Sequence, residues 1–256
     1  MSKLHQTLQL AKERKEKIFV PYIMAGDGGL HTLGEKITFL ESVGATAIEI
    51  GIPFSDPVAD GPTIQKAGMR ALNEGVSLED ILEELSTIRK KTNIPFIIMS
   101  YINPIFSYGI EKFQAKCHEA GVSGVIIPDV PLEEMELLNS IYMDEEISII
   151  QLVSLTTPTE RVKKIAQTSQ GFLYAVTVTG ITGERKEFSD QLNSFLELLK
   201  ANSSVPVLAG FGISSREQIE EMNELCDGVI VGSKIVQSFH ENKLQDIEQL
   251  TKVTTN

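Results

Sequence analysis

The chain has 256 residues, 42% of them hydrophobic, which is enough for one large domain or two small ones with a sizeable buried core. Its net charge of −12 at pH 7, with no basic tract to offset the acidic excess, argues against nucleic acid and anionic membranes as partners. No apolar run approaches the roughly 20 residues of a membrane-spanning helix, and the polar, lysine-rich N-terminus does not resemble a signal peptide.

Cysteine and histidine usage bears on metal binding and on the redox compartment. The two cysteines, Cys117 and Cys226, lie far apart, and neither they nor the four histidines follow the spacing of a metal site. We therefore expect reduced, structural cysteines, no bound metal and a cytoplasmic protein.

Helical and extended segments alternate along the chain, beginning with an amphipathic helix expected over residues 2–16. Strands are expected at residues 18–24, 47–51, 95–100, 124–128, 147–152, 172–177, 205–209 and 228–231. Helices are expected at residues 30–43, 62–91, 109–119, 132–144, 159–168, 190–199 and 214–225. Gly75 interrupts the second of these helices, and Ser77 with Asp80 predicts a fresh helix start.

Strict alternation of strands and helices predicts a parallel sheet with right-handed crossovers. Eight such units in about 250 residues are typical of a (β/α)₈ TIM barrel. We therefore predict an α/β fold with a single TIM-barrel domain over residues 1–256 and an extra N-terminal helix. An open, doubly wound sheet is the alternative, but no Gly-x-Gly-x-x-Gly motif follows the first strand.

The second strand and the loop after it carry two candidate acids. Glu49 alternates with Ile48 and Ile50, so it faces the opposite side of the sheet, among small neighbours. A lone glutamate near a strand end more often forms a salt bridge or faces water, but burial here would raise its pKa and suit it to acid/base work. Asp60 precedes Gly61-Pro62, and Gly61 rather than Asp60 would cap the following helix.

The last two strands each end in glycine-rich turns. Gly210-Phe211-Gly212 follows the seventh strand and Gly232-Ser233 the eighth, each beside a helix start. These glycines could simply permit tight turns. Two adjacent turns of bare backbone N–H groups at the strand ends of a barrel nevertheless favour a phosphate site.

The remaining strand ends supply the walls of a pocket. Tyr22, Tyr174, Phe211 and Ile64 could form a flat apolar slot beside the phosphate, although any one aromatic residue is more often part of a core. The polar loop at residues 179–189 is either a solvated loop or a lid that excludes water. Together these features predict acid/base chemistry on a phosphorylated substrate with an aromatic part.

The segment Glu49-Ile-Gly-Ile-Pro-Phe-Ser-Asp-Pro-Val-Ala-Asp-Gly-Pro-Thr-Ile-Gln closely resembles the signature of the tryptophan synthase alpha chain family. Supporting matches span nearly the whole chain in the family's order: Pro-Tyr-Ile-Met-Ala-Gly-Asp at 21–27, Tyr-Ile-Asn-Pro at 101–104, Pro-Asp-Val-Pro at 128–131, Thr-Gly-Ile-Thr-Gly at 179–183, Gly-Phe-Gly-Ile at 210–213 and Val-Gly-Ser at 231–233. The resemblance implies a lyase of tryptophan biosynthesis that cleaves indole-3-glycerol phosphate to indole and glyceraldehyde 3-phosphate by a retro-aldol reaction.

The resemblance also implies roles for single residues. Glu49 matches the family's acid/base, Asp60 the aspartate that binds the indole N–H, and Tyr174 a tyrosine near the scissile bond. Expected substrate contacts are Tyr22, Ile64, Tyr101, Thr182, Gly183, Phe211, Gly212, Gly232 and Ser233.

Family members pair with a beta chain that carries pyridoxal phosphate, so the resemblance implies an α₂β₂ heterotetramer and no cofactor in this chain. The residues expected to lie toward that partner are Pro53, Asp56, Asn103, Pro104, Asp129 and Pro131. Two other functions stay open: a largely regulatory partner subunit with little activity of its own, and a different phosphate-binding barrel enzyme.

Overall fold

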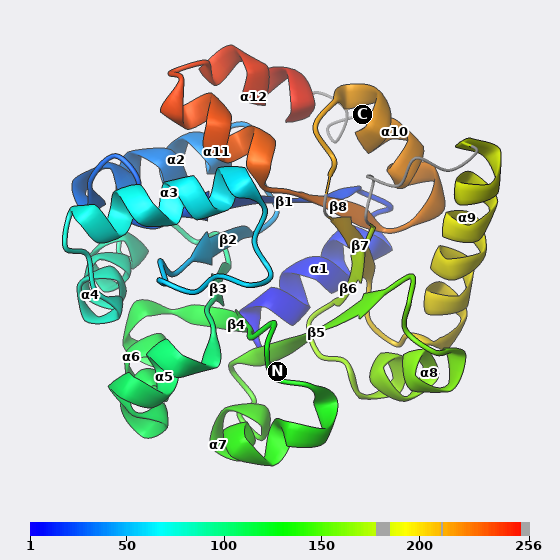
Figure 1. Ribbon diagram of the computed structural model, residues 1–256, viewed down its shortest axis with the longest axis horizontal. Coiled ribbons are helices and arrows are strands. Elements are labelled where there is room, and N and C mark those ends of the chain that lie inside the picture. Colours follow the sequence, from blue (N-terminus) through cyan, green and yellow to red (C-terminus); the bar gives the residue numbers. More distant parts are fainter. Residues whose placement is uncertain (178–184, 211, 252–256) are drawn as a thin grey trace.

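Eight parallel strands close into a barrel in chain order, with β8 hydrogen-bonded back to β1 (Figure 1). The computed structural model describes residues 1–177, 185–210 and 212–251. The strands are β1 Ile18–Met24, β2 Ile48–Gly51, β3 Phe96–Met99, β4 Val122–Ile126, β5 Ser148–Ser154, β6 Leu173–Val176, β7 Val207–Gly210 and β8 Gly228–Val231. The predicted (β/α)₈ barrel is thereby confirmed, whereas the extent of the domain over residues 1–256 stays a prediction.

Most of the helices surround this barrel on its outside, and the N-terminal helix lies across one end of it (Figure 1). The α-helices are α1 Lys3–Glu13, α2 Leu33–Ser42, α3 Pro62–Asn73, α4 Leu78–Arg89, α5 Ile102–Tyr108, α6 Ile110–Ala120, α7 Asn139–Tyr142, α8 Thr159–Thr168, α9 Arg185–Asn202, α10 Arg216–Leu225, α11 Ser233–His240 and α12 Leu244–Thr251. Two 3₁₀ segments are η1 Leu30–Thr32 and η2 Leu132–Leu138. Among the described residues, no helix is both long and apolar enough to cross a membrane.

Most expected elements are present, and two expected ranges were wrong. Residues 132–144 form η2 followed by the short α7, not one α-helix, and α9 begins at Arg185, inside the stretch expected to be a loop. The helix α5 was not expected at all, and no range was given for α11 and α12. The predicted break at Gly75 is confirmed, and Ser77 with Asp80 forms a capping box at the start of α4.

Alternating residues of each strand point into the barrel or toward the helices. On β1, Val20 and Tyr22 belong to the interior cluster, while Phe19 and Ile23 belong to the layer between strands and helices. This period-2 pattern is what a strand buried on both faces requires. Glu49 on β2 shares the interior side with the first of these sets.

The N-terminal helix α1 closes the amino end of the barrel. Leu4 and Leu8 are fully buried and belong to the interior cluster. A Cβ atom on Gly124 of β4 would lie 2.7 Å from Leu4 Cδ2, so the glycine makes room for this plug. The Ser2 hydroxyl is hydrogen-bonded to that of Ser148 at 2.6 Å. Ligand access is therefore expected at the opposite, carboxyl end of the strands, as in other barrels of this type.

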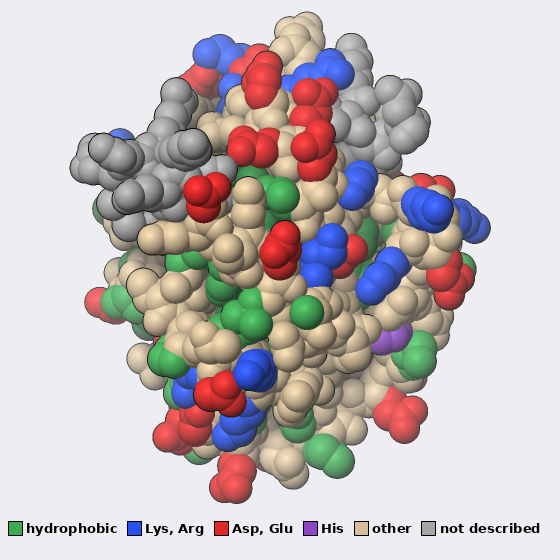
Figure 2. All heavy atoms as spheres, turned by 90° about the vertical axis from the view of Figure 1, so that its right-hand side faces the viewer, with side chains coloured by type: hydrophobic (Ala, Val, Ile, Leu, Met, Phe, Trp, Pro, Cys, Tyr) green, Lys and Arg blue, Asp and Glu red, His purple; other side chains and the backbone are tan. Residues whose placement is uncertain are grey.

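The surface carries charges of both signs. On the face over α8, α9 and α10, basic side chains are scattered among acidic ones and form no single basic stripe among the coloured residues (Figure 2). With a net charge of −12, this distribution offers no electrostatic footprint for nucleic acid on that face.

Candidate active site

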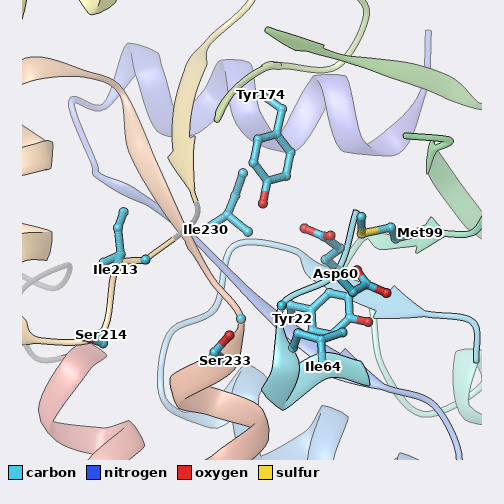
Figure 3. Close-up of a pocket in the computed structure, with 13 residues that line it drawn as sticks. Tyr22, Asp60, Ile64, Met99, Tyr174, Ile213, Ser214, Ile230 and Ser233 are labelled. Carbon is cyan, nitrogen blue, oxygen red and sulfur yellow. The ribbon is translucent and has the colours of Figure 1, made fainter. Parts of the chain in front are cut away.

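A cavity of about 240 Å³ opens at the carboxyl end of the strands (Figure 3). Its lining combines two acids, two tyrosines, apolar side chains and glycine-rich turns. The lining residues are Tyr22, Glu49, Asp60, Gly61, Ile64, Met99, Tyr174, Gly212, Ile213, Ser214, Ile230, Gly232 and Ser233. They come from six strands or strand ends that the barrel brings together.

Glu49 is the most deeply buried of the acids, with 1% of its surface exposed. Its Oε2 atom is buried and has no hydrogen-bond partner among the described residues. Burial, and secondarily the charge of Asp60, raises the pKa of Glu49 from 4.5 to about 8. The carboxyl group is therefore protonated at neutral pH, and it can give a proton and take one back near that pH.

Asp60 lies at the cavity rim just before α3. Gly61 is the N-cap of that helix and Pro62 its first residue, with no side-chain capping bond, so Asp60 is not the cap, as expected. Burial raises its pKa from 3.8 to about 6, while a hydrogen bond with Tyr101 acts in the opposite direction. Because Asp60 loses its proton before Glu49 does, the site at pH 7 holds one ionised and one neutral carboxyl group.

Two tyrosines stand over glycines on neighbouring strands. A Cβ on Gly51 of β2 would lie 1.9 Å from Tyr22 Oη, and one on Gly210 of β7 would lie 2.7 Å from Tyr174 Oη. Each tyrosine ring therefore occupies the space that a side chain at Gly51 or Gly210 would need. Burial raises the pKa of each tyrosine well above 10, so both remain neutral.

Three helices begin beside the cavity: α3 after Gly61, α10 after Ser214 and Ser215, and α11 at Ser233. The first residue of α3 is Pro62, which has no N–H group to offer, and the amides ahead of α10 and α11 differ in their partners. The N–H groups of Ser214 and Ser215, ahead of α10, both donate to Gln218 Oε1, at 2.8 Å and 3.2 Å. At α11, by contrast, the N-cap residue Gly232 makes no side-chain capping bond. The first-turn amides of α11 therefore favour an anion, next to Ser233 in the cavity wall.

The structure brings most of the predicted site residues together. Glu49, Asp60, Tyr174, Tyr22, Ile64, Gly212, Gly232 and Ser233 all line the cavity. Thr182, Gly183 and Phe211, and the first part of the predicted lid at residues 179–189, lie outside the described residues. Tyr101 is not part of the lining and instead contacts the segment that carries Asp60.

Sequence reasoning missed five lining residues: Gly61, Met99, Ile213, Ser214 and Ile230. For Met99 and Ile230 a signal was available, since both lie at inward-facing positions near the ends of their strands. Among the described residues, no group of three or more His, Cys, Asp or Glu could hold a metal ion.

The residues predicted to lie toward a partner occupy the segments that follow β2, β3 and β4, with Asn103 and Pro104 in α5. Asp56, Asn103, Asp129 and Pro131 are exposed, Pro104 is half-buried and Pro53 is buried. Two exposed apolar side chains in these segments were not predicted: Val58, in the loop after β2, is 84% exposed, and Phe106, in α5, is 45% exposed.

Comparisons with known proteins agree on one family. The family model described as tryptophan synthase alpha chain matches residues 8–256. The tryptophan synthase alpha chains of Bacillus anthracis (strain CDC 684 / NRRL 3495) and Bacillus cereus (strain ZK / E33L) are each 49% identical over 249 residues, 97% of this chain and 96% of theirs.

Solved structures give the same result. The crystal structure of tryptophan synthase subunit alpha from Legionella pneumophila superposes with a TM-score of 0.87 at 33% identity, covering 99% of this chain and 98% of that one. Ligand-free tryptophan synthase from M. tuberculosis superposes with a TM-score of 0.87 at 29% identity, covering 98% and 96%. The chain belongs to the tryptophan synthase alpha chain family.

Proposed function

We propose that the cavity at the carboxyl end of the barrel is where this chain, a lyase by its family, cleaves indole-3-glycerol phosphate to indole and glyceraldehyde 3-phosphate. One observation carries the assignment of this site. A buried, protonated Glu49 and an ionised Asp60 face the same apolar cavity, which ends at an open helix N-terminus. This cleavage needs a proton donor, a negative charge near the indole ring and a phosphate-binding site, and the cavity provides all three.

The substrate's phosphate would bind the first-turn amides of α11 and the Ser233 hydroxyl, where backbone dipoles stabilise a dianion. Its indole ring would lie against the apolar lining of Tyr22, Ile64 and Ile230. This places the glycerol chain between the two ends, beside Glu49. Holding both ends of the substrate fixes the scissile bond relative to the acid.

In the proposed reaction, Glu49 protonates C3 of the indole and positive charge develops on the ring. Asp60, ionised at neutral pH, accepts a hydrogen bond from the indole N–H and stabilises that charge. The Glu49 carboxylate then assists loss of the proton from the adjacent glycerol hydroxyl. The carbon–carbon bond breaks, its electron pair returns to the ring, and the hydroxyl carbon becomes the aldehyde. Tyr174, neutral and buried beside this site, has a supporting role.

The test is indole formation from indole-3-glycerol phosphate by the purified chain. Glu49→Gln is expected to keep the fold and lose cleavage, because the amide cannot donate and recover the proton. Glu35→Gln, on the exposed side of α2, is the matched control and should retain activity. Turnover by the Glu49→Gln variant would refute the role assigned to Glu49.

A beta chain is the partner that the family suggests, and we place its docking surface on the segments after β2, β3 and β4. Val58 and Phe106 would be its apolar centre, with Pro53, Asp56, Asn103, Pro104, Asp129 and Pro131 around them. The assembly would be an α₂β₂ heterotetramer in the cytoplasm, with pyridoxal phosphate held by the beta chain and no cofactor in this one.

Sedimentation of this chain mixed with a family beta chain checks the docking surface. Val58→Asp should weaken association, since it places a charge in the apolar centre of the contact. Leu10→Asp is a control at an exposed apolar position on α1, at the other end of the barrel, and should leave association unchanged. If Val58→Asp binds the beta chain as tightly as Leu10→Asp does, the interface does not include Val58. Assays of indole formation with and without the beta chain also test the regulatory alternative, which predicts that this chain has little cleavage activity of its own.

A further inference from the structure

Tyr101 contacts the loop between β2 and α3, which carries Asp60, and does not line the substrate cavity. It follows β3, is 4% exposed, and its hydroxyl accepts a hydrogen bond from the Ala59 N–H at 2.9 Å. Ala59 directly precedes Asp60, so the same hydroxyl lies beside the Asp60 carboxyl group, whose pKa it lowers by hydrogen bonding. Because a tyrosine hydroxyl has one proton, it accepts from Ala59 and donates to Asp60. One side chain thus fixes both the backbone and the carboxylate at the loop's end.

Tyr101 is itself held on two sides. The Phe54 ring, from the start of the same loop, packs against it with centroids 5.4 Å apart. Tyr101 is also the N-cap of α5, whose first amide, on Ile102, donates to both Asp129 carboxylate oxygens at 3.1 Å and 3.3 Å. The exposed Asp129 therefore fixes the helix start that positions Tyr101.

We propose that Tyr101 is a positioning residue that aims the Asp60 carboxylate at the substrate's indole N–H, and that Asp129 anchors Tyr101 from the docking surface. This inference rests on the proposed function, since it assigns a role in that reaction. It also gives a physical route by which a partner covering Asp129 reaches Asp60, through two contiguous hydrogen-bonded steps.

The groups around Asp60 show that its pKa is the quantity that should change when Tyr101 is replaced. Glu49, Tyr22 and Tyr174 face it across the cavity, and all three stay protonated at neutral pH. Tyr101, whose pKa burial raises to about 12, is the neighbour whose hydrogen bond lowers the pKa of Asp60. Without that bond Asp60 holds its proton to higher pH, and the proposed reaction needs it ionised.

The test compares the pH dependence of indole formation for the parent chain and for Tyr101→Phe. The parent should show a bell-shaped profile whose acid limb reports Asp60 and whose alkaline limb reports Glu49. In Tyr101→Phe the acid limb should move up by about one pH unit, which lowers activity about tenfold at acidic pH. The alkaline limb should stay in place. Titration of the substrate phosphate is common to both chains, so the difference between them isolates the enzyme.

The variant is expected to fold. Phenylalanine keeps the ring contact with Phe54, exposed Ala59 can bond to water, and Gln65 Nε2 still donates to the Asp60 carbonyl at 2.8 Å. Tyr108→Phe, on the same helix but bonded to Glu79 instead, is the matched control and should leave the profile unchanged. Asp129→Ala, at an exposed side chain, should move the acid limb in the same direction by less.

Each outcome bears on one claim. Superimposable acid limbs for the parent chain and Tyr101→Phe would overturn the positioning role while leaving the proposed function intact. If Tyr101→Phe does not fold, an unshifted limb in Asp129→Ala overturns it instead. Absence of indole formation by the parent chain, with and without the beta chain, would overturn the proposed function itself.

Discussion

Replacing Glu49 by glutamine should stabilise the folded chain at alkaline pH although it removes the catalytic acid. In the unfolded chain this carboxyl group ionises at about 4.5, whereas burial raises its pKa in the folded chain to about 8. Between these two values folding requires proton uptake, so the stability of the parent chain falls as pH rises. Below pH 4.5 the group is protonated in both states and contributes nothing to the pH dependence.

The size of the effect follows from the same two values. Each pH unit between them costs the parent chain about 1.4 kcal/mol, which is about 3 kcal/mol at pH 7 and at most about 5 kcal/mol above pH 8. Glutamine is never charged and avoids this cost. Against a total stability of about 5–15 kcal/mol for a typical protein, the difference is readily measured.

Urea unfolding followed by circular dichroism, at intervals from pH 5 to pH 8.5, measures the free energy of unfolding of both chains. The difference at pH 5 contains the contribution of the amide's shape and hydrogen bonding plus a first part of the ionisation cost, because the carboxyl group of the unfolded chain, with a pKa of about 4.5, is already mostly ionised there. Only the growth of the difference with pH reports the ionisation. A difference that stays constant from pH 5 to pH 8.5 would refute the assignment of Glu49 as a buried carboxyl group with a raised pKa.

Two further predictions concern the phosphate site and the closed end of the barrel. Ser233→Asp should raise KM for indole-3-glycerol phosphate at least about tenfold, because the new negative charge repels the phosphate. The chain should stay folded, since a negative charge is favourable at a helix N-terminus. The control is Thr159→Asp in the exposed first turn of α8, which makes the same charge change and should leave KM unchanged. An unchanged KM in Ser233→Asp would place the phosphate elsewhere. Leu4→Ala should lower the free energy of unfolding by about 2–5 kcal/mol, since it leaves a cavity at a fully buried position between α1 and the barrel. A loss below about 0.5 kcal/mol in a urea titration would show that the packing of α1 against the barrel is not essential for stability.

The barrel could be predicted from sequence because its strands and helices differ in the spacing of their hydrophobic residues and in the residues that end them. The run Ile18–Met24 was expected with the bounds that the structure shows. Gly44, at a φ of +94°, ends α2 where the sequence predicted a stop, since only glycine adopts that backbone conformation readily. These are local signals, and local signals determine most of the element order here.

Elements that depend on distant contacts were missed. The helix α5 begins with its Ile102 amide bonded to Asp129, a partner 27 residues later in the chain. Residues 132–144 have helical composition, but η2 covers Leu132–Leu138, where the two buried side chains, Met135 and Leu138, are three residues apart. A 3₁₀ helix has three residues per turn and places such positions on one side.

The site was predictable where chemistry is unusual and not where it is ordinary. An acid inside an apolar strand, as at Glu49, is conspicuous in any sequence. Met99 and Ile230 have the side chains of ordinary core residues, and only their inward-facing positions near the strand ends indicate that they wall the cavity. The hydrogen bonds of Tyr101 to Ala59 and Asp60 join segments about 40 residues apart, which no local pattern reveals.

Titration of the Glu49 carboxyl group is the most direct test of the central claim. Carbon-13 NMR of the chain labelled at glutamate side chains, with the Glu49 signal identified by its absence in Glu49→Gln, gives the pKa without reference to turnover. The account predicts a midpoint of about 8, set mainly by burial. A midpoint near 4.5, the ordinary value for glutamate, would contradict it.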